Sequence, residues 1–493
     1  MPTDLNPSQR PLTLSDAARM VGGTLVGTRD AARPLLRVVT HSAEVKRGDL
    51  FVALDGHTSH GYEHYREAIS REAAAILISD EDPRPGEFPV IICKDKRKCG
   101  AEIANLMLGD PLSKLCIIGI TGTKGKSSTL AMLAALFEYM GEHPLCVGTL
   151  GIGAEGRLEP TVNTTPDLFF LLPHFARYVQ NGERTVLCEV SSQALADRRL
   201  DGIKIPLAIF TGFSRDHIGS HEHKNLSEYY RAKRRLFTDF SVCTSIAPLE
   251  SPYSFSMTRG VDRRLFASID TPSDLCLSPT QLTLCATRFL YRRQSYCLSV
   301  AGRTQLANAA LAVLAASELL TVPPERLLPA LSSVRIPGRM ECYRLGDVTY
   351  IIDYAHNGES LRSVCRAARP FCRGRMIVLF GSVGGRGECR RRDLVSAAEE
   401  EADLILLTED DTDGEERGSI LSQMLAYAHR RECFIRVPDR TEAIMTAHSL
   451  ARAGDTVLLL GKGHEQFLVR DGVRIPFSER EILRSLGAQP LFS

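Results

Sequence analysis

The stretch Gly119-Ile-Thr-Gly122-Thr-Lys-Gly125-Lys126-Ser-Ser128 is the part of the sequence from which the rest of the architecture can be worked out. The apolar run Leu115–Ile118 before it predicts a buried strand, and the apolar residues at helical spacing after it predict a helix. Glycines let the backbone approach a phosphate, and the helix N-terminus points N–H groups at it. We therefore predict a phosphate-binding loop, made of Gly122, Thr123, Lys124, Gly125, Lys126, Ser127 and Ser128.

The spacing of this loop differs from the common G-x-x-x-x-G-K-S pattern, because Ile120 stands where the first glycine is expected. The shorter core Gly122-Thr-Lys-Gly125-Lys126-Ser127 keeps the residues that carry the chemistry: Lys126 supplies a point charge and Ser127 a hydroxyl for Mg²⁺. The alternative is a Gly/Lys turn between strand and helix with no ligand, which the matching strand and helix disfavour.

Composition limits the possible functions. The chain has 493 residues, 44% of them hydrophobic and 24% charged, so it is a folded protein of about three domains. Lys+Arg 60 against Asp+Glu 59 gives no reason to expect a nucleic acid or a membrane as partner. The first ten residues lack a signal peptide's apolar region, and no run approaches about 18 apolar residues. We therefore expect a cytoplasmic protein that is a monomer. Its 14 cysteines are expected to be reduced, and they contain no C-x-x-C pair of the kind that binds zinc.

The pattern of strands and helices predicts an α/β fold in three domains, at residues 1–112, 113–337 and 338–493. A small α/β domain begins with the capping pattern Thr13-x-x-Asp16 and ends at Asp110-Pro111. The central domain contains the phosphate loop and a mostly parallel sheet, with a possible antiparallel excursion over 241–300. The last domain alternates five apolar strands with helices, which is typical of a doubly wound, Rossmann-like parallel sheet.

Polar residues follow several predicted strands of the central domain, where ligands of parallel sheets collect. Glu189 follows the strand beginning at Thr185, and His217 follows the strand Leu207–Thr211. Lys233 lies on a predicted helix. Oxygen ligands from Ser127 and Glu189 suit Mg²⁺. Taken singly, His217 is more often a structural residue and Lys233 a solvated one.

The order of motifs resembles the bacterial Mur ligases. It includes Gly122-Thr-Lys-Gly-Lys-Ser127, Asn163-Thr-Thr-Pro-Asp167, Glu189-Val-Ser-Ser192, Asp353-Tyr-Ala-His356 and Gly461-Lys-Gly-His-Glu465. Within the family, the chain is most similar to enzymes that add the third stem-peptide residue to UDP-N-acetylmuramoyl-L-alanyl-D-glutamate. The resemblance implies an ATP-dependent amide ligase that uses Mg²⁺, with UDP-binding, ATPase and amino-acid-binding domains in that order. It also implies an acyl-phosphate intermediate in peptidoglycan precursor synthesis.

The resemblance implies roles for individual residues. Lys126, Glu189, His217 and Lys233 would be catalytic. Ser127 and Glu189 would hold one Mg²⁺, and His217 a second with Lys233, whose amine would be carbamylated (N6-carboxylysine). The nucleotide would contact Asn308, Arg339 and Asp353, and the UDP-muramoyl-dipeptide would contact Ser42, Thr164, Thr165, Ser191 and Arg199. Ser42 lies in His41-Ser-Ala43, where relatives usually carry Asp-Ser-Arg, so the details of uridine recognition stay open.

The added amino acid would be bound in the last domain by Arg386, Asp410, Asp411, Asp413, Gly461 and Glu465. The Asp-Asn-Pro-Arg motif of diaminopimelate enzymes is replaced by Asp410-Asp-Thr-Asp413. An aspartate facing a second carboxylate disfavours meso-diaminopimelate, so L-lysine is the expected substrate and L-ornithine the second choice. The acidic run also has a plain alternative role, as the cap of a helix starting near Glu415.

Two other functions are compatible with these motifs. One is a superfamily ligase with another acceptor, similar to folylpolyglutamate synthase, and the other is a paralogue that binds but does not catalyse. Turnover of a non-nucleotide acceptor would favour the first. The intact Lys126, Glu189, His217 and Lys233 argue against the second.

Overall fold

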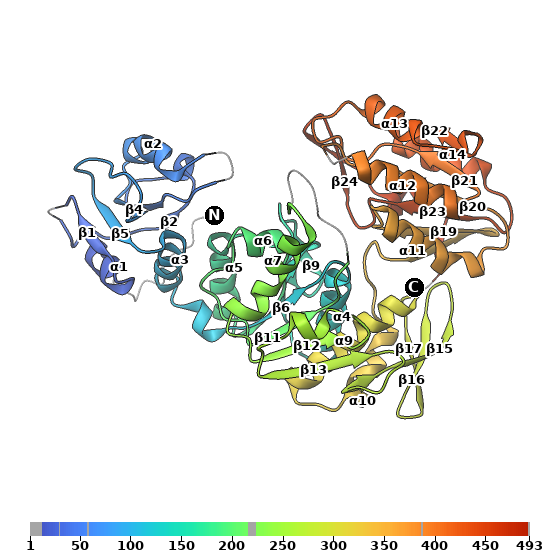
Figure 1. Cartoon of the computed structure of the whole chain (residues 1–493), viewed down its shortest axis with the longest axis horizontal. Helices are drawn as coiled ribbons and strands as arrows, with labels where there is room; N and C mark the ends of the chain where they lie inside the picture. The colour runs from blue at the N-terminus through green and yellow to red at the C-terminus, as the bar shows by residue number, and fades with distance from the viewer. Residues whose placement is uncertain (1–11, 29, 57–58, 215–222, 386–387, 492–493) are drawn as a thin grey trace.

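The computed structural model describes residues 12–28, 30–56, 59–214, 223–385 and 388–491. It contains three α/β bodies, each built on its own sheet, which follow one another along the chain (Figure 1). The first body lies at one end, and the second lies between it and the third. The predicted α/β class and three-domain organisation are confirmed.

The first domain is a five-stranded sheet in the order β1-β5-β4-β3-β2. Thr13 and Asp16 form the predicted capping box at the start of α1. The elements are α1 (Leu14–Met20), β1 (Thr24–Val26), β2 (Val38–Val39), β3 (Leu50–Val52), α2 (Tyr65–Ser70), β4 (Ala75–Ser79), β5 (Val90–Cys93) and α3 (Lys96–Met107).

The central domain has a nine-stranded sheet in the order β14-β13-β12-β11-β6-β10-β7-β8-β9. β6, which leads into the phosphate loop, lies in the middle, parallel to β10 and β11. The strands of the sheet are β6 (Cys116–Thr121), β7 (Leu145–Gly148), β8 (Gly151–Ala154), β9 (Arg157–Glu159), β10 (Thr185–Glu189), β11 (Leu207–Phe210), β12 (Thr244–Pro248), β13 (Arg263–Ser268) and β14 (Leu275–Cys276).

Helices cover both faces of this sheet, because successive strand residues point to opposite sides. Ile118 and Ile120 of β6 pack with α4 and α9, whereas Ile117 packs with α5 and α7. The helices are α4 (Lys126–Tyr139), α5 (Leu168–Gln180), α6 (Ser192–Ala196), α7 (Leu226–Asp239), α8 (Ser254–Met257), α9 (Arg303–Leu320) and α10 (Pro324–Leu327).

Residues 241–300 are antiparallel only in part. β12 and β13 extend the parallel sheet, so the predicted excursion is wrong for this half of the segment. β15 (Ser278–Leu282), β16 (Thr287–Tyr291) and β17 (Gln294–Leu298) do form a separate antiparallel sheet. It projects at the far end of the central domain (Figure 1).

The third domain has a seven-stranded sheet in the order β22-β21-β20-β23-β19-β18-β26. The first five strands in this order, from β22 through β23 to β19, are parallel, as predicted. β18 and β26 add an antiparallel edge. The elements are β18 (Glu341–Leu345), β19 (Val348–Asp353), α11 (Gly358–Ala368), β20 (Met376–Phe380), α12 (Glu388–Glu401), β21 (Leu404–Leu407), α13 (Arg417–Ala426), β22 (Phe434–Arg436), α14 (Arg440–Leu450), β23 (Thr456–Leu460), β24 (Phe467–Arg470), β25 (Val473–Pro476), α15 (Glu479–Ser485) and β26 (Gln489–Pro490).

The connection between the second and third domains is short. Ile336 is 3% exposed and packs into the central core. Two residues later, Gly338 already belongs to the third domain, because its N–H donates to Glu341 Oε1 (3.0 Å) and its carbonyl accepts from Tyr354 N (2.9 Å). Exposed Pro337 lies between them.

All fourteen cysteines are free thiols in the structure. Within the described ranges, no single helix is long and apolar enough to cross a membrane. The bent pair Arg303–Leu320 and Pro324–Ser332 has the length and composition, but its residues pack in the central core.

Candidate functional site

The predicted phosphate loop connects β6 to α4. Gly125 is the N-cap of α4 with φ +87°, a conformation that favours glycine. A β-carbon there would lie 2.5 Å from Asn308 Oδ1 on α9, so the predicted nucleotide residue Asn308 packs directly on the loop. Lys126 Nζ donates to the carbonyls of Gly122 (2.9 Å) and Thr123 (3.3 Å), which keeps its charge inside the loop.

Glu189 is a buried carboxylate at the carboxyl end of β10, facing the start of α4. Its Oε2 accepts from Ser127 Oγ (2.9 Å) and Thr149 Oγ1 (3.1 Å), and its Oε1 accepts from Thr149 N (3.0 Å). A β-carbon on Gly148 would come within 2.4 Å of Oε1, so the chain leaves room for this carboxylate. The predicted pair of oxygen ligands, Ser127 and Glu189, is therefore together, and this donor set fits Mg²⁺.

Thr149 is a residue that the sequence reasoning missed. It follows β7, which pairs with β10, so it reaches the same edge of the sheet as Glu189. The available signal was its place after an apolar strand.

Lys233 is buried on α7, so the alternative of a solvated lysine is wrong. Its Nζ donates to the carbonyl of Gly122 (2.8 Å) and lies 4.7 Å from the centre of the Tyr229 ring. The Tyr229 hydroxyl donates to Thr123 Oγ1 (3.1 Å). Lys233 thus reaches the phosphate loop, while His217, its predicted partner at a second Mg²⁺, lies outside the described residues. Among those described, no three His, Cys, Asp or Glu side chains form a metal-binding group.

Four of the five residues predicted to contact the UDP-muramoyl-dipeptide lie together beside Glu189. Thr165 Oγ1 donates to the Glu189 carbonyl (2.8 Å) and accepts from Ser191 N (3.0 Å). Arg199 Nη1 donates to the Thr165 carbonyl (3.2 Å). Thr164 Oγ1 lies 3.2 Å from Thr149 Oγ1.

Arg339 and Asp353 lie where the third domain begins. The Arg339 guanidinium lies 4.9 Å from the centre of the Tyr354 ring. Asp353 accepts from the N–H groups of Met340 and Ala355, both at 2.9 Å. Burial raises the pKa of the Asp353 carboxyl, against the opposing charge of Arg339. Asp353 thus fixes the start of this domain; its predicted nucleotide contact stays a prediction.

The acidic run of the third domain is arranged differently from the expectation. Lys462, fully buried, places Nζ 2.8 Å from Asp411 Oδ1 and 3.7 Å from Asp410 Oδ1, and it contacts Glu465 as well. Burial alone would lower the pKa of Lys462, but the three carboxylates outweigh it and the pKa is raised. The chain therefore supplies its own ammonium to carboxylates that were expected to receive one from the substrate.

The capping alternative for this run is also wrong. α13 begins at Arg417, and its cap is Glu416, which accepts from the N–H groups of Gly418 and Ser419. Among the described residues, Glu409 pairs with the side chains of Arg417 and Arg470 and accepts no hydrogen bond from the first N–H groups of α13.

The other residues predicted to bind the added amino acid are Gly461, Asp413 and Arg386. Gly461 has φ +111°, and a β-carbon there would meet Asp410 Oδ2 at 3.0 Å. Asp413 is exposed with φ +44°, and its Oδ2 lies 3.3 Å from where a β-carbon on Gly385 would be. Arg386 lies outside the described residues.

Ser42 lies far along the chain from these residues, in the first domain. It is 9% exposed, and its Oγ donates to Glu67 Oε2 (2.5 Å). This hydrogen bond is the main cause that lowers the pKa of Glu67.

Side chains of the third domain reach the central domain at several points, among them Cys342, whose Sγ donates to the Leu284 carbonyl (3.5 Å). Glu359, in the first turn of α11, pairs with Lys124 of the phosphate loop (2.9 Å) and accepts from Ser214 Oγ (3.4 Å). His464 lies against the backbone of Thr149. Burial, together with the positive charges of Arg339, Arg480 and Lys462, lowers the pKa of His464 to about 4.

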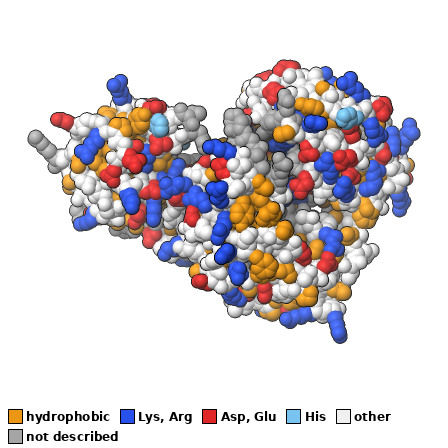
Figure 2. Space-filling view, viewed as in Figure 1, with side chains coloured by type: hydrophobic (Ala, Val, Ile, Leu, Met, Phe, Trp, Pro, Cys, Tyr) orange, Lys and Arg blue, Asp and Glu red, His pale blue; other side chains and the backbone are white. Residues whose placement is uncertain are grey.

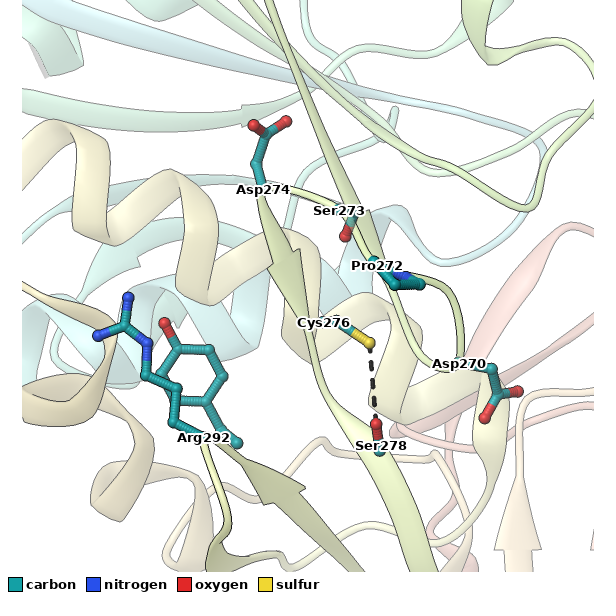
Figure 3. Close-up of a pocket in the computed structure, with 8 residues that line it drawn as sticks. Asp270, Pro272, Ser273, Asp274, Cys276, Ser278 and Arg292 are labelled. Atoms are coloured by element: carbon teal, nitrogen blue, oxygen red, sulfur yellow. Dashed lines mark hydrogen bonds between the residues drawn. The ribbon is translucent and has the colours of Figure 1, made fainter.

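A cavity of about 430 Å³ lies away from all of these residues (Figure 3). It is lined by Asp270, Pro272, Ser273, Asp274, Cys276, Ser278, Tyr291 and Arg292. None of the predicted site residues takes part in it.

Comparison with known proteins gives consistent matches. The Mur ligase middle domain matches residues 120–316, and the Mur ligase glutamate ligase domain matches residues 338–463. UDP-N-acetylmuramoyl-L-alanyl-D-glutamate–2,6-diaminopimelate ligase of Aquifex aeolicus is 31% identical over 91% of this chain and 93% of its own. The enzyme of the same name from Xylella fastidiosa strain 9a5c is 32% identical over 91% of this chain and 92% of its own.

Solved structures agree with these matches. A structure of a protein with that same enzyme name has a TM-score of 0.68 and 25% identity, covering 97% of this chain and 98% of its own. A folylpolyglutamate synthase of Mycobacterium tuberculosis, complexed with ADP and AMPPCP, has a TM-score of 0.60 at 17% identity, over 72% of this chain and 90% of its own. That second likeness concerns the fold alone.

Proposed function

The chain belongs to the Mur ligase family of ATP-dependent amide ligases, and from this premise we propose that it joins a diamino acid to UDP-N-acetylmuramoyl-L-alanyl-D-glutamate. The observation that carries the proposal is one edge of the central sheet. There the phosphate loop, the Ser127–Glu189 pair and the cluster of Thr165, Ser191 and Arg199 lie side by side. A nucleotide phosphate and an acceptor carboxylate bound at this edge would be neighbours.

The chemistry of amide formation explains why these groups are needed together. A carboxylate is a poor acyl donor, so its oxygen first attacks the γ-phosphorus of ATP; the bond to the β-phosphate oxygen breaks and ADP leaves. The amine then attacks the acyl phosphate, loses a proton and expels inorganic phosphate. Lys126 and the N–H groups of the loop orient the phosphates and neutralise their charge. Mg²⁺ held by Ser127 and Glu189 would add further charge stabilisation.

A second metal position would involve Lys233 and His217. Lys233 reaches the phosphate loop, where a carbamate on its amine would present oxygen in place of an ammonium. Carbamylation of Lys233 and metal binding by His217 stay predictions.

The identity of the amino acid has to be revised. The relatives described above are named for 2,6-diaminopimelate, which was expected to be disfavoured, so the preference for L-lysine has no support from them. The buried Lys462 also removes part of its basis, since Asp410 and Asp411 already have a cation. We therefore propose meso-diaminopimelate as the first candidate. L-lysine is the second, favoured by Asp413 at the position where the diaminopimelate motif has arginine, and L-ornithine the third.

An ADP-release assay tests both parts of the proposal. Purified protein is given MgATP and the UDP-muramoyl-dipeptide, with meso-diaminopimelate, L-lysine or L-ornithine each offered alone. We expect ADP release that needs both the dipeptide and an amino acid, fastest with diaminopimelate. No turnover with any of the three would contradict the diamino-acid proposal, and faster turnover with lysine would restore the original expectation.

Asp413→Arg sharpens this assay. If Asp413 faces the distal end of the amino acid, the variant gains use of diaminopimelate and loses use of lysine. Unchanged kinetics with both amino acids would remove Asp413 from the specificity argument.

The two alternative functions predict different results in these assays. A folylpolyglutamate synthase-like ligase would turn over a non-nucleotide acceptor and leave the UDP-muramoyl-dipeptide unused. A binding paralogue would bind MgATP without hydrolysing it when both substrates are present. The monomeric state and the cytoplasmic location stay predictions, which sedimentation and cell fractionation would test.

A further inference from the structure

Two ion pairs join helix α3 of the first domain to the central domain. Arg97 Nη1 contacts Asp167 Oδ2, and Asp95 Oδ2 contacts Arg198 Nη2. Both first-domain partners belong to the N-terminal end of α3, where Asp95 is the N-cap. Figure 2 shows Lys and Arg side chains gathered along this junction between the two domains.

Asp167 is part of the segment proposed to bind the dipeptide. It follows Thr165 by two residues and caps α5, accepting from Phe169 N (3.1 Å) with the oxygen that Arg97 leaves free. Arg97 therefore fixes the orientation of a carboxylate at the end of the Thr164–Thr165 segment.

Arg198 is equally close to the same contacts. It has φ +59°, an unusual conformation for a residue with a side chain, and it is held there by Asp95 on one side and by Asp201 (2.7 Å) on the other. The next residue, Arg199, directs its guanidinium to the Thr165 carbonyl. Asp95 thus supports the backbone from which Arg199 reaches the dipeptide contacts.

Apolar packing accompanies the two ion pairs at this junction. The Phe169 side chain belongs to the apolar clusters of both domains. A β-carbon on Gly100 of α3 would lie 3.2 Å from Phe169 Cζ and 2.9 Å from Val52 Cγ2, so α3 fits closely between the two cores.

We propose that Asp95 and Arg97 are positioning residues that set the separation between the uridine end and the dipeptide end of the substrate site. The inference rests on the proposed function, in which the first domain holds the uridine nucleotide and the central domain holds the muramoyl-dipeptide. A ligand that is held at both ends binds more tightly than either of its parts does alone. The gain depends on how well the distance between the two binding sites matches the length of the ligand. The two ion pairs fix this separation without touching the ligand.

The test uses the whole chain and three ligands: UDP, muramoyl-L-alanyl-D-glutamate without UDP, and the two joined. The variant combines Asp95→Asn, which keeps the helix cap, with Arg97→Gln, which keeps the side-chain length. Calorimetry gives the Kd for each ligand, and initial rates give KM and kcat. Arg19→Gln is the matched control, because Arg19 pairs with Asp16 inside the first domain.

We expect the double variant to bind UDP as the wild type does, the separate muramoyl-dipeptide slightly more weakly, and the joined substrate about fivefold to tenfold more weakly. The KM for the joined substrate would rise, while the Kd for MgATP stays the same. The single variant Arg97→Lys, which keeps the positive charge, would retain most of the wild-type affinity for the joined substrate. Equal loss for all three ligands, or no loss for the joined one, would overturn the inference. If the wild type itself neither binds nor ligates the joined substrate, the proposed function fails first, which separates the two results.

Discussion

Glu189 offers the clearest test of whether the buried carboxylate serves chemistry or only stability. Its two oxygens accept three hydrogen bonds, from the Ser127 hydroxyl and from the hydroxyl and N–H of Thr149. In Glu189→Gln the amide oxygen can still accept from the Thr149 N–H, and the new NH₂ can donate to the two hydroxyl oxygens. The hydrogen bonds are therefore kept, and only the charge is lost.

The magnitudes follow from this count. Each hydrogen bond contributes about 1 kcal/mol net, and leaving a buried partner unsatisfied costs about 1–3 kcal/mol. Glu189→Gln should change the free energy of unfolding by less than about 1 kcal/mol. Glu189→Ala removes all three acceptors and opens a cavity beside Gly148, so we expect a loss of about 2–5 kcal/mol.

Activity should fall sharply in Glu189→Gln, although its stability is kept. If the carboxylate holds Mg²⁺ at the phosphates, Glu189→Gln should lower kcat by about 10²–10³-fold, the usual range for one electrostatic group. Urea unfolding and substrate-dependent ADP release, measured on the same preparations, check the two effects. A fully active Gln variant would refute the metal role. An inactive variant that is also destabilised by several kcal/mol would show that the hydrogen bonds had been misjudged.

Three further predictions use other contacts. Gly125→Ala should destabilise the protein by about 1–3 kcal/mol and weaken MgATP binding, because its φ is +87° and the new methyl would meet an oxygen of α9 at 2.5 Å; Gly141→Ala, at φ +84° in open space, should cost less and leave MgATP binding intact. Glu359→Gln should tighten MgATP binding about twofold at low salt and less at high salt, because it frees Lys124 from an exposed ion pair; an unchanged Kd would contradict this. His464 should weaken the fold in acid: its pKa is lowered to about 4 from 6.5, so the stability it contributes is present above pH 6.5 and is lost as pH falls towards 4, by about 2 kcal/mol between pH 7 and pH 5. Urea unfolding of the wild type and of His464→Phe at both pH values should show this extra loss in the wild type alone.

The parts of the fold that were predicted are those set by local pattern. A strand, a glycine-containing loop and a helix follow directly from residues 115–137, and β6 and α4 lie there. The sharing of one edge by Glu189 and Ser127 was also predictable, because parallel strands end at the same edge of a sheet. Their direct contact depends on β6 lying beside β10.

The parts that were not predicted depend on contacts between distant residues. Thr149 reaches Glu189 only because β7 lies beside β10, and strand order cannot be derived from one sequence. The acidic run was taken as a site for a substrate's ammonium, whereas the cation is Lys462, about fifty residues later. Charge pattern identifies groups that need a partner and leaves open whether the partner is a ligand or the chain itself.

The junction at Pro337 limits how the third domain can move. Ile336 is anchored in one core and Gly338 is hydrogen-bonded into the next, so a change of orientation has to arise from a few bond rotations between them. The proline ring removes one of these, because it locks φ near about −65°. The few remaining rotations, together with Cys285 and Ala301 of the central domain, which pack into the core of the third, narrow the range of directions in which the last domain can turn.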